Sequence, residues 1–521
     1  MGESHVFVTK GSLTNFACDA WLLPTDRSYS IRKHWRDAVR GLESAVNDSR
    51  DAPFGSKSKL TQPLDSWPVG EPLPVLTAVP YEGISSVDDL IAPLREFVQV
   101  AAESSRERSA KGRRDTARPV PLLGIPLFGT GGGGAGFVRG DVIKRLLEEA
   151  RRAAAEAQVD IALVLRDEKD FAFAQELRKR NGTDWWPSLD PEVRGQAQRL
   201  ADYALEGKLV PFMGAGVSMS AGAPSWGQLL DGLASEARLS EPDKTSLRKR
   251  SNLDQAGILR SIFSERAERG GTSFNQAIAS RVDLKRYGLA PTLLATLGSR
   301  EAITLNYDTL FEMASADAGI PRTVIPDGAQ EKNAWLLKLH GSVTNPESIV
   351  LTRDDYLGFN VSRNALSALV KATLMTQHLL FVGFGLEDDH FHEILHDVRR
   401  ALPRTVHEKD GIATALMLSK DPLGERMWSN QLSLVSMGPD ASGSTARTLE
   451  IFLDYLVAQA ADSHSYLLAE GYEHALSNAE QSLRKKLQDL DLQLTSDEKA
   501  SSGGRRLEAM LAELGASSRI A

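Results

Sequence analysis

Short apolar runs alternate with amphipathic segments along the first 182 residues of the chain. Runs that are typical of buried strands lie near 6–9, 20–24, 74–79, 120–127 and 159–165. Segments with the spacing of amphipathic helices lie between them, near 32–47, 86–108, 139–157 and 170–180. Because such alternation builds a sheet covered by helices, we expect a three-layer α/β domain over 1–182.

The alternation resumes after a polar, turn-rich linker at 181–195. A helix is predicted at 191–206 and a strand at 209–213, and residues 227–300 have a largely helical pattern. Further strands are predicted at 301–308, 335–341, 348–352, 379–385, 412–418 and 432–436, and further helices at 309–318, 363–376, 388–401 and 445–461. Apolar strands separated by helices imply a mainly parallel sheet that is buried on both faces.

These patterns divide the chain into three parts, 1–182, 183–462 and 463–521. The last part has the composition of a charged amphipathic helix up to about residue 494, with a break at Ser501-Ser502-Gly503-Gly504. A helical tail of this kind either mediates self-association or packs on the core, and the sequence leaves both possibilities open. We expect the protein to form a homo-oligomer.

Length and composition set the class of the protein. A chain of 521 residues is too long for one hydrophobic core. Its 61 basic and 69 acidic residues give a net charge of −8, so we expect no direct nucleic-acid partner. No apolar stretch approaches the roughly 20 residues that cross a membrane, and no signal-peptide pattern is visible. We therefore expect a cytoplasmic protein with no membrane partner.

A glycine turn follows the first strand of the second part. The stretch KLVPFMGAGVSMSAGAPSW at 208–226 runs from an apolar strand into Gly214-Ala215-Gly216, and a helical pattern begins at Trp226. A strand that opens through glycines into a helix can present backbone N–H groups to a phosphate. A purely structural turn has the same sequence pattern, so this stretch alone does not decide between the two.

Three later strands also end in polar or glycine residues. Asn306-Tyr307-Asp308 closes one strand, His340 follows another, and Gly383-Phe384-Gly385 follows a third. Asn and Asp also favour helix caps, which gives a structural alternative for Asn306 and Asp308. An imidazole titrates near neutrality, so His340 can take a proton from a hydroxyl or a water. In an open α/β sheet the ligand lies at such strand ends.

The four stretches 208–226, 303–312, 336–356 and 379–391 together resemble the NAD-binding core of the sirtuin-like family, in its bacterial defence-associated (Thoeris-type) branch. The resemblance covers about 190–440. It implies a Rossmann-like domain in which the helical insertion caps the nucleotide cleft, with NAD as the substrate and no metal. It assigns Asn306, His340 and Asp308 to catalysis, with Asp308 fixing the loop or the nicotinamide side of the site. The cofactor-binding residues would be Gly214, Ala215, Gly216, Ser218, Ser225, Trp226, Tyr307, Gly383, Phe384, Gly385 and Asp388.

Departures from the family pattern favour NAD hydrolysis over protein deacylation. Deacylating sirtuins carry a four-cysteine zinc module between the histidine and the later glycine motif, whereas the only cysteine here is Cys18. A further departure, Pro224-Ser225-Trp226 in place of the family's commoner Pro-Asp-Phe-Arg, leaves open how the nicotinamide end of NAD would be recognised. His392 and His396 are spaced as on one helix face, but no third metal ligand is evident.

The leading hypothesis is therefore an NAD+ glycohydrolase that yields nicotinamide and ADP-ribose or cyclic ADP-ribose. In the resembled class, such an enzyme depletes NAD+ on phage infection under the control of a ligand or a partner defence protein. Two alternatives stay open, an NAD-dependent protein deacylase and a non-catalytic NAD- or ADP-ribose-binding regulatory protein.

A second glycine loop lies in the first part of the chain. Residues 129–137 follow a buried strand and resemble the diphosphate-binding loop of macrodomains, the ADP-ribose-binding fold. Ser12 stands where macrodomains have an acidic residue, and Pro24-Thr25-Asp26 replaces their asparagine-rich strand end, so an ADP-ribose hydrolase is not expected. The resemblance implies an ADP-ribose-like signal nucleotide at Gly129, Thr130, Gly131, Gly132, Gly133, Gly134 and Phe137. A scaffold domain is the alternative.

Overall fold

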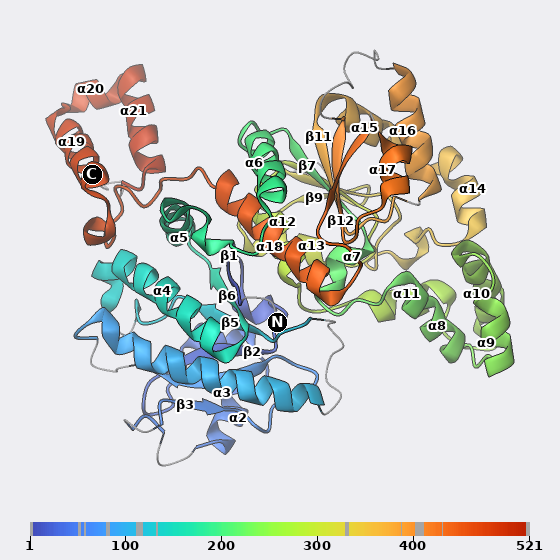
Figure 1. Ribbon diagram of the computed structural model, residues 1–521, viewed down its shortest axis with the longest axis horizontal. Coiled ribbons are helices and arrows are strands. Elements are labelled where there is room, and N and C mark those ends of the chain that lie inside the picture. The colour runs from blue at the N-terminus through green and yellow to red at the C-terminus, as the bar shows by residue number, and fades with distance from the viewer. Residues whose placement is uncertain are drawn as a thin grey trace. The chain divides into compact units, whose positions relative to one another are not determined.

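The computed structural model describes residues 4–50, 54–56, 59–79, 84–110, 118–131, 134–328, 333–386, 388–401, 411–429 and 431–516. The described chain falls into two compact units (Figure 1). The first unit comprises Met1–Asp190 together with Asp454–Ala521, and the second comprises Pro191–Leu453. Both units are α/β, and their sheets are parallel except at one edge strand of the first, which confirms the predicted fold class at this level.

In the described part of the first unit, six strands form one sheet in the order β1-β6-β5-β2-β4-β3. Their bounds are β1 (Val6–Lys10), β6 (Asp160–Leu165), β5 (Leu122–Pro126), β2 (Ala20–Thr25), β4 (Leu73–Ala78) and β3 (Thr61–Pro63). The five predicted strands are confirmed and pair in parallel. β3 pairs antiparallel with β4 at the edge. It escaped prediction because three residues that include a proline carry no periodicity.

Helices α3 (Ile91–Ala110), α4 (Arg139–Ala157) and α5 (Glu168–Arg180) of this unit agree with the prediction. The helix predicted at 32–47 is instead two short helices, α1 (Lys33–Ala38) and α2 (Leu42–Asp48). The break lies at Gly41, whose φ of 81° is left-handed. A helix cannot continue through that conformation, which glycine adopts without strain.

The C-terminal segment packs within the first unit, whereas the sequence set 463–521 apart as a tail. It begins inside α18 (Gly443–Ala460) and continues to α19 (Asn478–Gln493), α20 (Ser496–Ala500) and α21 (Ser502–Glu513). Ser501 at the predicted break is the N-cap of α21. Tyr472 donates its hydroxyl to Asp170 at 2.6 Å. Amphipathic periodicity shows that one face of a helix is buried, but not against which part of the chain.

A buried carboxylate joins this segment to the rest of the unit. Asp454 is fully buried and accepts hydrogen bonds from Trp186 Nε1 at 2.8 Å and from two guanidinium nitrogens, Nη1 and Nη2, of Arg178. His5 Nε2 lies 2.9 Å from its Oδ2. Burial by itself raises the pKa of Asp454, but Arg178 and His5 outweigh it and hold that pKa below its usual value.

In the described part of the second unit, seven strands form a parallel sheet in the order β13-β12-β11-β7-β8-β10-β9. Their bounds are β7 (Leu209–Met213), β8 (Glu301–Thr304), β9 (Thr323–Ile325), β10 (Trp335–Lys338), β11 (His378–Val382), β12 (Ala413–Met417) and β13 (Leu432–Ser436). Strands added after β7 lie first on its β8 side and then, from β11 on, on its other side. The carboxyl ends of β7 and β11 are therefore a topological switch point, where open α/β sheets bind ligands.

One predicted strand of this unit is wrong. Residues 349–352 are not in the sheet, and a short 3-10 turn at Pro346–Ser348 precedes them. Ile349 and Leu351 are apolar because they pack, together with Tyr307, into the core of the helical insertion. β9 was missed because only three residues form it.

The predicted helical insertion consists of α8 (Trp226–Glu236), α9 (Glu241–Leu247), α10 (Asn252–Ala267), α11 (Phe274–Val282) and α12 (Leu289–Thr296). The first four each begin after a serine whose hydroxyl accepts a hydrogen bond from the backbone N–H three residues on. Such serine caps satisfy a helix N-terminus and explain where these helices start.

The other helices of the second unit cover the sheet. They are α6 (Pro191–Leu205), α7 (Ala215–Met219), α13 (Leu310–Asp317), α14 (Arg353–Ser362), α15 (Asn364–Thr376), α16 (Asp389–Ala401) and α17 (Pro422–Trp428). The main core lies between them and the sheet, with Phe212 and Phe381 of neighbouring strands at its centre. Helices α7, α14 and α17 were not predicted from the sequence.

Candidate active site

The two glycine turns of the second unit contact each other through their backbones. Gly214 N–H donates to Val382 O at 3.0 Å, and Gly216 N–H donates to Gly383 O at 2.9 Å. A Cβ on Gly214 would lie 2.5 Å from Gly383 O, and a Cβ on Gly383, whose φ is +62°, would overlap Val217 N. Both glycines are thus required by close packing as well as by any ligand.

Asn306 and Asp308 meet Ser218 in a short hydrogen-bonded chain. Asn306 Nδ2 donates to Ser218 Oγ at 2.9 Å, and Ser218 Oγ donates to Asp308 Oδ2 at 2.7 Å. The other oxygen of Asp308 accepts from Leu310 N–H at 3.0 Å, at the start of α13. The side chain of Asp308 therefore binds the first backbone N–H of α13, although Thr309 is the N-cap residue, whereas the amide of Asn306 is oriented through Ser218.

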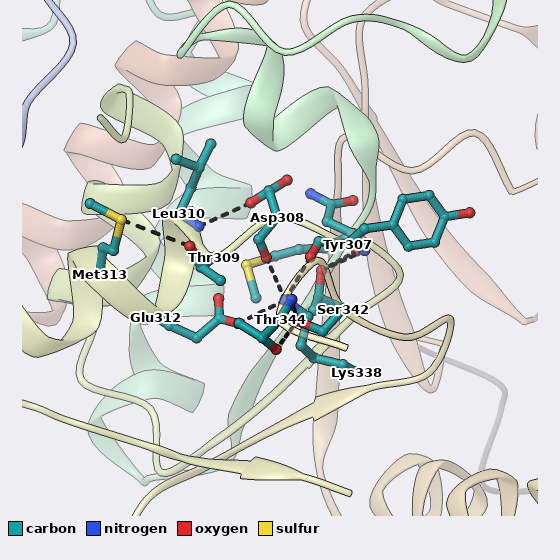
Figure 2. A network of polar contacts seen from close by, with 12 residues as sticks. Tyr307, Asp308, Thr309, Leu310, Glu312, Met313, Lys338, Ser342 and Thr344 are labelled. Carbon is teal, nitrogen blue, oxygen red and sulfur yellow. Dashed lines mark hydrogen bonds and ion pairs between the residues drawn. The ribbon is translucent and has the colours of Figure 1, made fainter. Parts of the chain in front are cut away.

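Lys338 holds the backbone of the same loop (Figure 2). It is the last residue of β10, and its side chain is 1% exposed. Nζ donates to the carbonyl of Tyr307 at 3.3 Å and to the carbonyl of Asp308, and it forms an ion pair with Glu312 at 2.7 Å. Burial raises the pKa of Glu312, although Lys338 opposes this effect. A buried ammonium with these partners fixes where residues 306–308 leave the sheet.

His340 lies just beyond the end of β10 and is 3% exposed. Its ring contacts Tyr356 edge to face, with the centroids 5.4 Å apart. Its Nε2 has no hydrogen-bond partner among the described residues and lies 3.9 Å from Asp388 Oδ2. Burial lowers the pKa of His340 to about 4, against the opposing effect of Asp388. The imidazole is therefore neutral near pH 7 and can accept a proton.

Tyr356 and Asp388 form the wall beside His340. The Tyr356 hydroxyl donates to Asp388 Oδ2 at 2.8 Å, and Asp388 Oδ1 accepts from Phe391 N–H at 3.0 Å. Burial raises the pKa of Tyr356, so this hydroxyl stays protonated and remains a donor. The carboxylate is therefore held at the start of α16.

One cavity of about 390 Å³ is lined by Ser218, Asn306, Asp308, His340, Tyr356 and Asp388. The predicted residues that line it are Gly214, Ala215, Ser218, Trp226, Asn306, Tyr307, Asp308, His340, Gly383, Phe384, Gly385 and Asp388. Two predicted residues do not line it. Gly216 packs on Gly383, and Ser225 caps α8 through a reciprocal hydrogen-bond pair with Gln228.

Sequence reasoning missed several lining residues, among them Asn252, Leu253, Val282, Tyr356 and Asp389. Asn252, Leu253 and Val282 come from the helical insertion, whose sequence shows periodicity but no motif. Tyr356 lies at the end of a stretch already singled out, 336–356. A polar residue on a helix shortly after the histidine motif was the available signal.

The comparisons with known proteins agree with this geometry. Residues 300–433 match the SIR2-like domain. This segment contains Asn306, His340 and Gly383, while the first glycine turn lies outside it. Defense-associated sirtuin 2 of Bacillus subtilis is 30% identical over 237 residues, which are 43% of this chain and 23% of that protein. NAD(+) hydrolase ThsA of Bacillus cereus (strain MSX-D12) is 30% identical over 229 residues, or 42% of this chain and 45% of that protein.

A further relative, NAD(+) hydrolase ThsA of Enterococcus faecium, is 29% identical over 219 residues, 39% of this chain and 43% of that protein. The chain thus spans less than half the length of these relatives. Residues 300–433 are thus similar to a SIR2-like domain, and less than half of the chain aligns with each of these relatives. In the described part of the chain, we find no helix with the length and apolar character needed to span a bilayer.

The first unit has a cavity of its own, of about 470 Å³, at the ends of β2 and β5. Of the predicted second-site residues, Gly129, Thr130 and Gly131 line it. Gly134 starts a 3-10 turn with φ 76°, and Phe137 is 72% exposed and lies outside the lining. Gly132 and Gly133 lie outside the described residues.

Basic and aromatic residues that were not predicted complete this second cavity. Arg32, His34, Trp35 and Arg139 line it together with Thr25 and Asp26. A Cβ on Gly131 would overlap Arg32 Nη1, so the glycine lets the guanidinium approach the loop backbone. Burial and the neighbouring arginines lower the pKa of His34. The guanidinium of Arg32 beside a glycine loop favours an anionic ligand, whereas the guanidinium of Arg139 is paired with Asp170.

His392 and His396 of α16, which the sequence spacing places on one helix face, do not form a shared site. His392 Nε2 lies 2.7 Å from Leu386 O, and His396 is exposed. His390 instead lies beside His340, with the ring centroids 5.7 Å apart. The sequence prediction of no metal for catalysis stays a prediction.

Proposed function

We propose that this chain is an NAD+ glycohydrolase whose active site is the cavity of the second unit. The observation that carries the proposal is the convergence of a buried neutral histidine, His340, and an oriented amide, Asn306, on one cavity at the switch point of a parallel sheet. The match to a SIR2-like domain and the likeness to proteins named NAD(+) hydrolase support it.

The reaction breaks the bond between the nicotinamide nitrogen and C1′ of the adjoining ribose, and the electron pair of that bond leaves with nicotinamide. A water oxygen adds to C1′, and the proton of that water goes to His340 Nε2. Nε2 of His340 has no hydrogen-bond partner among the described residues, and in the neutral tautomer with its proton on Nδ1 this atom has the lone pair that accepts the proton. The products are nicotinamide, ADP-ribose and a proton. A cyclic ADP-ribose forms if a nucleophile on the substrate replaces the water.

The other residues of the cavity bind NAD+ and orient the reacting groups. Asn306, directed by Ser218, places the acceptor against the ribose, and Asp308 acts through Ser218 because both its oxygens already accept hydrogen bonds. The turn at Gly383–Gly385 and the ring of Phe384 face the cavity where the adenosine half would lie. Asp388, held by Tyr356, offers its carboxylate to a ribose hydroxyl.

The cavity of the first unit is a candidate regulatory site. Its glycine loop, the arginine side chain Arg32 and the aromatic ring of Trp35 suit an ADP-ribose-like nucleotide. We propose that this ligand, or a partner defence protein, gates NAD+ cleavage, so that the protein depletes cytoplasmic NAD+ on phage infection, acting as a homo-oligomer. Coupling between the sites must be reciprocal, so an NAD analogue must change the affinity for the regulatory nucleotide by the same factor.

The experiment is to incubate the purified chain with NAD+, with and without ADP-ribose, and to follow nicotinamide by chromatography. Release without any peptide supports the glycohydrolase. Release only in the presence of an acetylated peptide would identify a deacylase, and binding of NAD+ without release would identify a regulatory protein.

A further inference from the structure

His340, Asp388 and His390 bring three ligand atoms together beside the proposed active site. Among the described residues these atoms lie within 4.8 Å of one another. The three side chains come from the end of β10 and from the start of α16, which the fold holds side by side. No sequence pattern indicates this group, because His340 and His390 are 50 positions apart and no spacing rule relates them.

Each of the two histidines has a buried ring nitrogen without a hydrogen-bond partner among the described residues. These atoms are Nε2 of His340 and Nδ1 of His390. His390 Nε2 lies 3.1 Å from the carbonyl oxygen of Tyr356. A carbonyl can only accept, so Nε2 carries the proton and Nδ1 of the neutral ring has a lone pair.

The surrounding residues fix the direction of these lone pairs. The ring of His390 stacks between Tyr356 and Phe359, with centroid distances of 4.2 and 3.8 Å. Asp388 is held by Tyr356 and by its own helix N-terminus, with Oδ2 3.9 Å from His340 Nε2. Two imidazole nitrogens and a carboxylate oxygen thus lie within 4.8 Å of one another.

We propose that a divalent zinc-class cation binds His340, His390 and Asp388 and inhibits the enzyme. Two histidines, one carboxylate and an open fourth position form a donor set that Zn2+ takes readily. Zinc–nitrogen bonds of about 2.0–2.1 Å place tetrahedral ligand atoms roughly 3.3 Å apart, so a pair of atoms at the full 4.8 Å must close by about 1.5 Å. Asp388, the partly exposed member of the group, can give up its hydrogen bond from Tyr356 and turn toward the ion.

The inhibition follows from the lone pair of His340 Nε2, which the metal and the catalytic proton would both require. A metal bound at His340 Nε2 occupies the electron pair that otherwise accepts the proton of the attacking water. The inhibitory part therefore rests on the proposed function, whereas binding of the metal does not.

Calorimetric titration of the full, chelator-treated chain with zinc chloride tests the binding. We expect one ion per chain, and a loss of affinity in His390→Ala and in the nearly isosteric Asp388→Asn. Loss of even an outer partner of a metal site costs about 10–100-fold in affinity, so losing a ligand should cost at least that. His396→Ala, on the exposed face of the same helix, is the matched control and should bind zinc as the wild type does. Asp388→Asn keeps the test valid if His390→Ala does not fold.

Equal zinc affinity in the wild type, His390→Ala and Asp388→Asn, or no binding by the wild type, would overturn the site. In the nicotinamide assay, saturating zinc should abolish release by the wild type, and a chelator should restore it. Zinc that binds at this site but leaves release unchanged, or increases it, would overturn the inhibitory role. If the chain releases no nicotinamide under any condition, the proposed function fails, while the titration still decides the metal site.

Discussion

The ammonium of Lys338 donates a hydrogen bond to the backbone carbonyl of Asp308, whose side chain holds Ser218 and, through it, Asn306. A buried cation at the end of β10 therefore sets the position of the amide that would orient the reaction. Figure 2 shows this ammonium between the loop at 307–308 and Glu312.

Lys338→Met keeps the apolar length of the side chain but removes its donors and leaves Glu312 buried without a counter-ion. Breaking a buried ion pair in this way costs about 3–5 kcal/mol of folding free energy. Urea unfolding of the variant measures this loss. We expect kcat for NAD+ cleavage to fall more than KM changes, because the loop moves.

The double variant Lys338→Met/Glu312→Leu separates a structural from a positioning role. Replacing both charges by apolar groups should recover most of the stability. Turnover should stay low, because the carbonyls of Tyr307 and Asp308 still lack their donor. Recovery of wild-type kcat in the double variant would show that Lys338 serves only as the counter-ion of Glu312.

The pH dependence of kcat/KM should reflect the buried state of His340. Its pKa is lowered from 6.5 to about 4, so the neutral base persists as the pH falls through 6.5 and is lost only near pH 4. The acid limb of the profile should therefore lie near 4. Circular dichroism at each pH must show that the fold persists. An acid limb near 6.5 would mean that His340 is solvated or is not the base.

Gly383→Ala should destabilise the second unit, because its φ of +62° disfavours a side chain and the new Cβ would overlap Val217 N. The left-handed conformation alone costs about 1–2 kcal/mol, and the clash adds to this. Gly385→Ala in the same turn is the matched control, since a Cβ there meets nothing within 4 Å. Thermal unfolding compares the two variants, and equal melting temperatures would contradict the close packing of Gly383 on residues 216–217.

Asp454→Ala should destabilise the first unit, because it leaves Arg178 buried without its partner. The expected loss is about 3–5 kcal/mol of unfolding free energy. Asp489→Ala, at an exposed position of α19, should change stability by no more than about 0.5 kcal/mol. Denaturant unfolding followed by tryptophan fluorescence measures both, since Trp186 contacts Asp454. A loss as small as that of Asp489→Ala would contradict the role of Asp454 as the link between residues 454–521 and the sheet.

Most strands of the two sheets could be predicted because a buried parallel strand has a continuous run of apolar residues bounded by turn residues. It also indicated the strand ends that carry Asn306, His340 and the glycine turns. It failed at 348–352, where Ile349 and Leu351 are apolar for a different reason, since they pack into the helical insertion. Short edge strands such as β3 carry too few residues to show a period.

Most of the missed site residues act through tertiary contacts that no local pattern records. In the sequence, Lys338 cannot be distinguished from an ordinary lysine of a strand. Only the fold shows that its side chain is buried and binds the loop at 307–308. His390 resembles any helix histidine until Tyr356 and Phe359 enclose its ring. Arg32 reaches the glycine loop of the first unit from a segment about 100 positions earlier in the chain. These placements depend on how elements pack, which periodicity does not encode.

Comparison of nicotinamide release by the wild type and by His340→Ala tests the central claim most directly. Both proteins should be folded and should bind NAD+ with similar affinity, measured by calorimetry at a temperature where turnover is negligible. General-base catalysis typically contributes about 10²–10⁴-fold, so release by His340→Ala should fall by at least about 10²-fold with ADP-ribose present or absent. Equal release by the two proteins, or none by the wild type in either condition, would contradict the account.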